Sequence, residues 1–333
     1  MAETAENPTP VEIQPVEPEK PPRSMRWTAV LGLALLAVIM LGTKSGAVQN
    51  AWRALTGNNL PLAASDPQPA GLPALSEHER EWIESLPPQQ QMEALVQSAI
   101  QHEEGATELI ARKLDSWQDQ LENTSRWTDL MMTALYSNDL RVRAAAMEIN
   151  LVAHRLEKDS DTVDSLIQKG QQDVSSRPYS AWMLGMLANR GVSPDRITAV
   201  LEEWMRDPNE QSRVWAIEGL ANIGTDETVK DFLWVFKNDQ SLLVRERAGC
   251  SLSKSGMLTR VQRMRAVPGL IDLAEESSLD DRTKTWVYQA LREITDERLG
   301  NDPSTWRTWW LEQGQDRIQK FASSDGQQVL GNS

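Results

Sequence analysis

The sequence is poor in the residue types that form cross-links and metal sites. Cysteine occurs once in 333 residues, as Cys250, and histidine occurs three times, as His78, His102 and His154. One thiol excludes an internal disulfide framework, and the three histidines have no spacing typical of a zinc site. We therefore predict that the chain has no disulfide, no bound metal and no cofactor.

Basic residues are also in short supply. The chain has 34 lysines and arginines against 48 aspartates and glutamates, which gives a formal net charge of −14. Nucleic-acid affinity comes largely from neutralising phosphates, so this balance disfavours a nucleic-acid partner. The sequence also lacks a phosphate-binding loop and a dinucleotide fingerprint. Paired acids such as Glu202-Glu203 point apart on a helix and do not form a general acid/base pair. We predict no catalytic residues and no small-molecule substrate.

One apolar run stands out near the N-terminus. Residues 27–43 are uncharged and leucine-rich, and their number lies at the short end of the range that spans a bilayer, about 17–25. We predict a disordered, acidic, proline-rich tail over 1–26, a transmembrane anchor over 27–43 and a proline-rich linker over 44–76. The alternative is the apolar region of a signal peptide, because Ser45-Gly46-Ala47 offers small residues for cleavage. The proline-rich acidic leader favours the anchor.

Charges beside the apolar run bear on its orientation. Lys20, Arg23 and Arg26 precede it, whereas Lys44 and Arg53 follow it. This difference of one charge favours a cytoplasmic N-terminus. The C-terminal domain of a single-pass membrane protein would then be extracytoplasmic, in the periplasm. The alternative is a domain that faces the cytoplasm.

A repeat of about 35 residues follows. Its clearest mark is a pair of apolar residues whose second members are 35, 36, 34, 32 and 38 residues apart. The pairs are Leu95-Val96, Leu130-Met131, Leu166-Ile167, Val200-Leu201, Phe232-Leu233 and Leu270-Ile271. Further apolar or small residues stand four before and three after each second member, which is one face of a helix. We predict that each pair lies in the first helix of a repeat.

A second helix recurs in each unit. A column of basic residues is formed by Arg143, Arg177, Arg213, Arg245 and Lys284. Four residues earlier stand Asp139, Asp173, Asn209, Ser241 and Asp280, all of them types that cap a helix N-terminus. Small or short side chains follow the basic column by three residues, and a leucine seam follows these in most units. We predict that the capping residues begin the second helices.

The pattern resembles HEAT repeats, particularly the short bacterial type. The motifs are Asp139-Leu140-Arg141-Val142-Arg143 with Ala146, Arg213-Val214 with Ala216 and Leu220, and Leu243-Val244-Arg245 with Ala248 and Leu252. The resemblance covers roughly residues 90–300. It implies an α-solenoid, a fold with an armadillo-like stack of helices, whose second helices line the inner surface. It also implies a ladder of aligned Asp and Arg side chains between units. The first unit departs from the pattern, with Glu108 and Asp115 where Arg and Leu are expected, as suits a terminal cap.

The C-terminal end carries a closing segment. Asp302 and Pro303 are suited to begin a helix, and Trp306, Trp309 and Trp310 share one of its faces. We therefore predict an all-α fold with a solenoid of about six stacked helix pairs over 77–314, a terminal capping helix and a C-terminal tail over 315–333.

Tryptophan is over-represented, with 13 residues against three tyrosines and three phenylalanines. Trp127, Trp204 and Trp286 fall on apolar helix faces and are predicted to lie in the core. Trp182 and Trp215 lie on second helices, away from the leucine seam, so we predict that they are partner-binding residues on the inner surface. Cys250, between small and apolar neighbours, is predicted to be a buried structural thiol.

These observations favour a membrane-anchored scaffold or adaptor that binds other proteins through a helical-repeat surface and is not an enzyme. Two alternatives remain open. The first alternative is a lyase-like enzyme subunit, because short HEAT arrays are similar to bilin-lyase subunits. A cytoplasm-facing regulatory or assembly adaptor is the other.

Overall fold

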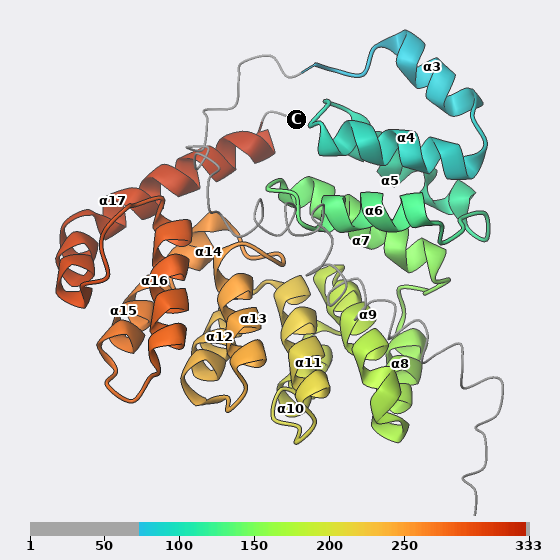
Figure 1. The fold of residues 1–333 in the computed structure, drawn as a ribbon. Coiled ribbons are helices and arrows are strands. Elements are labelled where there is room, and N and C mark those ends of the chain that lie inside the picture. The colour runs from blue at the N-terminus through green and yellow to red at the C-terminus, as the bar shows by residue number, and fades with distance from the viewer. Residues whose placement is uncertain (1–72, 331–333) are drawn as a thin grey trace, which may run out of the picture. The chain divides into compact units, whose positions relative to one another are not determined.

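The computed structural model describes residues 73–330, which form helices joined by short loops (Figure 1). They belong to the second of two units of the chain, Gln68–Ser333. The helices are α3 (Glu77–Ser85), α4 (Pro88–Ile100), α5 (Ala106–Trp117), α6 (Ser125–Leu135), α7 (Leu140–Ala153), α8 (Ser160–Gln172), α9 (Arg177–Asn189), α10 (Pro194–Trp204), α11 (Glu210–Ile223), α12 (Asp226–Asn238), α13 (Leu242–Ser253), α14 (Arg260–Met264), α15 (Val267–Glu275), α16 (Asp281–Thr295) and α17 (Pro303–Leu330), with a 3₁₀ turn η1 (Val174–Ser176) before α9. Within residues 73–330 there is no strand, only one bridge between Ala74 and Glu104.

Most of the predicted N-terminal features lie outside the described residues. These are the tail 1–26, the anchor 27–43 and the linker up to residue 72. In the part of the chain that the structure describes, no helix has the length and apolar character to cross a membrane. The last residues of the predicted linker belong to the helical unit, because Leu75 is buried and its N–H donates to the Glu104 carbonyl at 3.2 Å.

The predicted first helices are present. The six apolar pairs lie in α4, α6, α8, α10, α12 and α15. All of their side chains are buried except those of Val200 and Leu233, which are partly buried. Residues four positions apart on a helix lie on the same face, so the repeated pattern gives each first helix one buried face. The prediction of an all-α fold with helices in a regular order is confirmed.

The predicted caps begin four of the second helices. Asp139, Asn209, Ser241 and Asp280 each accept a backbone N–H from the first turn of α7, α11, α13 and α16. Asp173 differs, because it caps η1 and α9 begins four residues later at Arg177. Pro178 explains the delay, since its fixed φ and missing N–H suit the first turn of a helix.

Second helices pack on second helices, and α9, α11, α13 and α16 lie side by side in chain order (Figure 1). The predicted small residues make this possible: Ala146, Ser180, Ala216 and Ala248 are all buried. The leucine seam Leu184, Leu220, Leu252 and Leu291 is fully buried as well. The closest approach is between α9 and α11, where a Cβ on Gly185 would overlap the Gly219 backbone. This packing in order is consistent with an α-solenoid.

Two features of the C-terminal half depart from the prediction. The longest spacing in the repeat, 38 residues, is explained by the extra short helix α14 between α13 and α15. The predicted tail boundary at residue 314 does not coincide with a helix end, because α17 continues to Leu330. Phe321 is buried, and the Arg260 guanidinium lies 3.6 Å from the centroid of its ring. The repeat pattern gives no signal for this contact, because the surrounding sequence is polar.

Trp306 and Trp309 act as predicted for a terminal cap. Both are buried, and their rings meet edge to face at 6.1 Å. The Trp306 Nε1–H donates to the Gly300 carbonyl at 2.8 Å. Asp302 accepts the Thr305 backbone N–H at the start of α17, as expected of an N-cap.

Candidate functional site

The two tryptophans predicted as partner-binding residues are in contact. Trp182 comes from α9 and Trp215 from α11, and their ring centroids are 5.7 Å apart with an interplanar angle of 77°. This is the edge-to-face geometry that aromatic pairs prefer. Both side chains pack against the core on one side and are only partly buried. The pair therefore offers an aromatic surface that spans two consecutive repeats.

Polar groups extend this surface onto α13. Glu218 lies one turn after Trp215 and forms an ion pair with Arg247 of α13. The Arg247 Nη2–H donates to the Tyr136 hydroxyl at 2.8 Å. Burial raises the pKa of Tyr136, so the phenol is neutral at ordinary pH. We call Trp182, Trp215, Glu218 and Arg247 the inner strip. It runs from α9 across α11 to α13, with Tyr136 at its end.

An ion-pair ladder joins successive units beside the strip. Arg177 pairs with Asp207, Arg213 with Asp239 and Arg245 with Asp280. The prediction of an Asp–Arg ladder is confirmed for these three, and of their acids only Asp280 is itself the N-cap of a second helix. Asp207 and Asp239 lie two residues before the caps Asn209 and Ser241. The shared offset is the sequence signal that identifies them.

Arg143 breaks the ladder. Its guanidinium donates to the carbonyls of Ser137, Lys254 and Gly256 and has no carboxylate in contact among the described residues. The acid that its position in the column calls for is Asp173, whose carboxylate instead accepts from Ser175 and Ser176. The basic column therefore has two roles, since Arg143 bonds to carbonyls just after α13 instead of to a carboxylate of the next unit.

The remaining tryptophans divide between core and surface. Trp127 and Trp204 are buried, as predicted. Trp286 is only partly buried, and the Arg282 guanidinium lies 5.3 Å from its ring, so that prediction holds only in part. Trp234, which the repeat pattern does not single out, is 42 % exposed on α12 with the Arg206 guanidinium 5.3 Å from its ring.

Cysteine and histidine take structural positions. The Cys250 thiol is partly buried, and burial raises its pKa, so it is a poor nucleophile. The His154 ring lies between Trp127 and Tyr179, at centroid distances of 6.3 and 5.7 Å. Within residues 73–330 no group of three or more His, Cys, Asp and Glu side chains is arranged to hold a metal ion.

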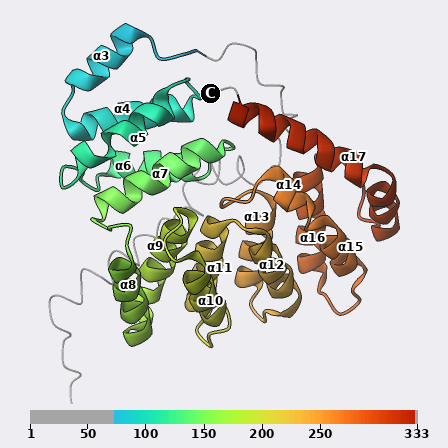
Figure 2. The same cartoon turned by 180° about the vertical axis from the view of Figure 1, so that it is seen from behind.

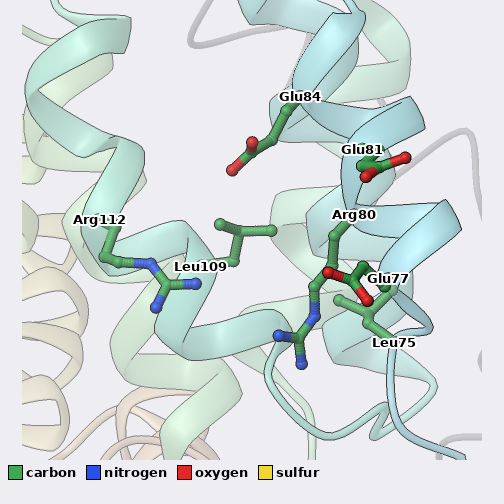
Figure 3. A pocket seen from close by; sticks show the side chains of 7 residues that line it. All are labelled: Leu75, Glu77, Arg80, Glu81, Glu84, Leu109 and Arg112. Atoms are coloured by element: carbon green, nitrogen blue, oxygen red, sulfur yellow. The ribbon is translucent and has the colours of Figure 1, made fainter.

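A cleft of about 510 Å³ opens between α3 and α5 (Figure 3). Its lining residues are Leu75, Glu77, Arg80, Glu81, Glu84, Leu109 and Arg112. The two leucines are buried and form an apolar floor. Carboxylates outnumber guanidinium groups, and Glu84 is paired with Lys113 at 3.4 Å. The mixed charge selects no class of ligand, so we assign it no role. The repeat pattern gives no signal for this cleft, because α3 lies before the first apolar pair of the repeat.

The comparisons leave the family open. No family model and no curated protein matches the chain. A solved structure of an engineered protein, determined by a structural genomics consortium, is similar at 15% sequence identity with a TM-score of 0.30. The match covers 61% of this chain and 96% of that one.

Proposed function

We propose that the chain is a scaffold or adaptor that binds another protein through the inner strip. The observation that supports this most directly is the contact between Trp182 and Trp215, two large rings that remain partly open to solvent. Tryptophan and arginine dominate the energetic centres of protein interfaces. The strip holds both, together with one carboxylate.

The arrangement of the helices favours an extended partner. The strip crosses three second helices, so a bound segment would touch several units at once. The ladder ion pairs between units limit relative movement of these helices, which lowers the entropy lost when a partner is bound. A net charge of −14 favours partners that are basic or neutral.

The repeat pattern supports an assignment to HEAT-like repeats, and the uncharged run 27–43 supports a membrane anchor. The excess of one basic residue before the run supports a periplasmic helical domain. An anchor confines the search for a partner to the membrane surface, where the effective concentration is higher. Deleting residues 27–43 tests the anchor: the full chain should sediment with membranes and resist alkaline extraction, and the deletion should be released. Equal release of both chains would contradict it. A reporter fused after Ser333 that is active on only one side of the membrane tests the orientation.

A comparative capture experiment tests partner binding. The full chain serves as bait beside the double variant Trp182→Ala, Trp215→Ala and the control Trp234→Ala. Trp234 is also solvent-exposed but lies on α12, outside the strip. We expect at least one protein to be captured by the full chain and by the control and to be lost with the double variant. Capture that the double variant leaves unchanged would contradict the proposal, as would turnover of bilin by the purified chain.

A further inference from the structure

The first turn of α7 contacts the loop between α13 and α14, which lies more than a hundred residues further along the chain. The Arg143 side chain is buried, with its residue 4 % exposed. Its Nη2–H donates to the Lys254 carbonyl at 2.6 Å, and its Nη1–H donates to the Gly256 carbonyl. Figures 1 and 2 both show the junction of α6 and α7 beside the α13–α14 loop. This is a contact between an early and a late part of the helical stack.

The end of α13 attracts a cation. The last carbonyls of a helix have no partner within it and carry the negative end of its dipole. The Arg263 guanidinium already donates hydrogen bonds to the carbonyls of Ser251, Leu252 and Ser255. Arg143 is therefore a second guanidinium on a helix end that a first one has largely satisfied. Burial lowers the pKa of Arg263 to about 9, and the nearby Arg143 charge contributes to the shift. The Arg143 contact has defined partners, but burying the Arg143 guanidinium and placing it near the Arg263 charge both reduce the free energy that the contact contributes.

A second contact joins the same early and late parts of the chain. Tyr136, in the loop between α6 and α7, accepts the hydrogen bond from Arg247 on α13. Arg247 belongs to the inner strip, where it is paired with Glu218. A partner that reaches Arg247 from solvent therefore meets Tyr136.

The packing between α7 and α9, which joins the early part α3–α7 to the later part α8–α17, is less extensive than the packing between the following second helices. α9 packs far more extensively on α11 than on α7. Between α7 and α8 the chain passes through residues 154–159, where Arg155 has a φ of 55°. One long ion pair, between Glu148 and Arg190 at 3.8 Å, also links α7 to the end of α9. Fewer contacts mean a lower cost of local opening.

We propose that Arg143 and Tyr136 form a latch between two bodies, α3–α7 and α8–α17, and that opening this latch exposes the end of the inner strip. In the closed state one N–H of Arg247 is bonded to the Tyr136 hydroxyl. In the open state the bodies turn about residues 154–159, and Arg247 and Glu218 become available to a protein partner. The coupling to a partner rests on the proposed function, whereas the latch itself is a property of the chain alone.

Hydrogen exchange on the full chain in detergent tests the latch without any partner. The variants are Arg143→Ala, the milder Tyr136→Phe and the control Arg177→Ala, which occupies the same column but bonds to Gly170 of its own unit and to Asp207 of the next one. We expect Arg143→Ala to speed exchange about ten- to a hundredfold in 136–143 and in 251–258 together, with 210–223 unchanged. Tyr136→Phe should speed the same two segments by a smaller factor, and Arg177→Ala should leave them as in the wild type. The proposal is wrong if the two segments do not change together.

A binding measurement tests the coupling. When a binding-competent state is only partly populated, the apparent affinity falls by that fraction. Arg143→Ala should therefore bind the captured partner more tightly than the wild type, by a factor limited by the population of the closed state. If exchange shows an open latch but the affinity is unchanged, the coupling is wrong although the latch exists. If no partner depends on Trp182 and Trp215, the proposed function fails while the exchange result still decides the latch.

Discussion

Arg213 and Asp239 form a two-pronged ion pair between consecutive repeats. The Arg213 Nε lies 2.7 Å from one carboxylate oxygen of Asp239 and Nη2 lies 3.1 Å from the other. The two side chains are 7% and 3% exposed. The hydrogen bond to Asp239 raises the pKa of Arg213, so the guanidinium stays charged in the folded protein.

Removing one partner of this pair should therefore be costly. We expect Asp239→Ala to lower the free energy of unfolding by about 3–5 kcal/mol, because it leaves a buried guanidinium without its carboxylate. Arg196→Ala, which breaks the exposed pair with Asp164, should cost no more than about 1 kcal/mol. Urea unfolding followed by circular dichroism measures both. Equal costs for the two variants would contradict a structural role for the ladder.

The leucine seam provides a second test of stability. Leu220 is fully buried between α11 and its neighbours, so Leu220→Ala should lower the free energy of unfolding by about 2–5 kcal/mol through lost transfer energy and a residual cavity. Leu243→Ala is the matched control, because that side chain is 47 % exposed. Its cost should stay within about 0.5 kcal/mol. A near-zero cost at Leu220 would show that the seam does not run where the structure places it.

The close approach of α9 and α11 depends on two glycines. A Cβ at Gly185 would overlap the backbone of Gly219, which has no side chain to move away. Gly185→Ala should therefore destabilise the fold by about 1–3 kcal/mol, although alanine is the better helix former. Gly300→Ala, where a Cβ would meet nothing, should have no such effect. Thermal unfolding of both variants decides the matter, and a stabilised Gly185→Ala would contradict the close packing.

Asp231 should make the free energy of unfolding depend on pH. Burial raises the pKa of this carboxyl to about 6, with Glu202 adding to the shift and Arg206 and Lys230 opposing it. Its Oδ2 atom is buried and has no hydrogen-bond partner in the described part of the chain. Between pH 4 and pH 6 the folded state holds a proton that the unfolded state has released. Stability therefore falls as the pH rises through this window.

Asp231→Asn should abolish this dependence. The variant should be more stable than the wild type at pH 7, and its advantage should shrink steadily toward pH 4, where the carboxyl is protonated in the folded state and about half protonated in the unfolded state. Glu203→Gln, on the exposed face of α10, is the control and should change neither value. Urea midpoints at pH 4, 5, 6 and 7 measure the effect. An advantage that is the same at all four pH values would show that charge burial is not the cause.

The repeat could be predicted from the sequence because its signals are local. Apolar residues at helical spacing, such as Leu166 and Ile167, bury one face of the first helices, and the side chains of Asn209 and Ser241 cap the second helices by accepting backbone N–H groups of the first turn. Trp182 and Trp215 were predicted separately from their positions on second helices. Their contact could only be anticipated from the order in which the helices pack.

The features that the sequence did not reveal depend on distant parts of the chain. Arg143 has the same place in its repeat as Arg213, yet it bonds to carbonyls near residue 255 because the helical stack brings the end of α13 beside it. The extension of α17 carries two apolar residues within a polar segment, the buried Phe321 and Ile318, which packs against the core. Neither has a periodic signal, since each contact is made only once.

The most direct test of the account is the affinity of the purified full chain for the protein that it captures, measured by calorimetry. The account predicts that Trp215→Ala weakens binding at least about tenfold, the loss expected of an aromatic residue at the centre of an interface. Trp234→Ala should bind as the wild type does, with both variants equally folded by circular dichroism. Equal affinity of Trp215→Ala and the wild type would contradict the inner strip as the binding surface.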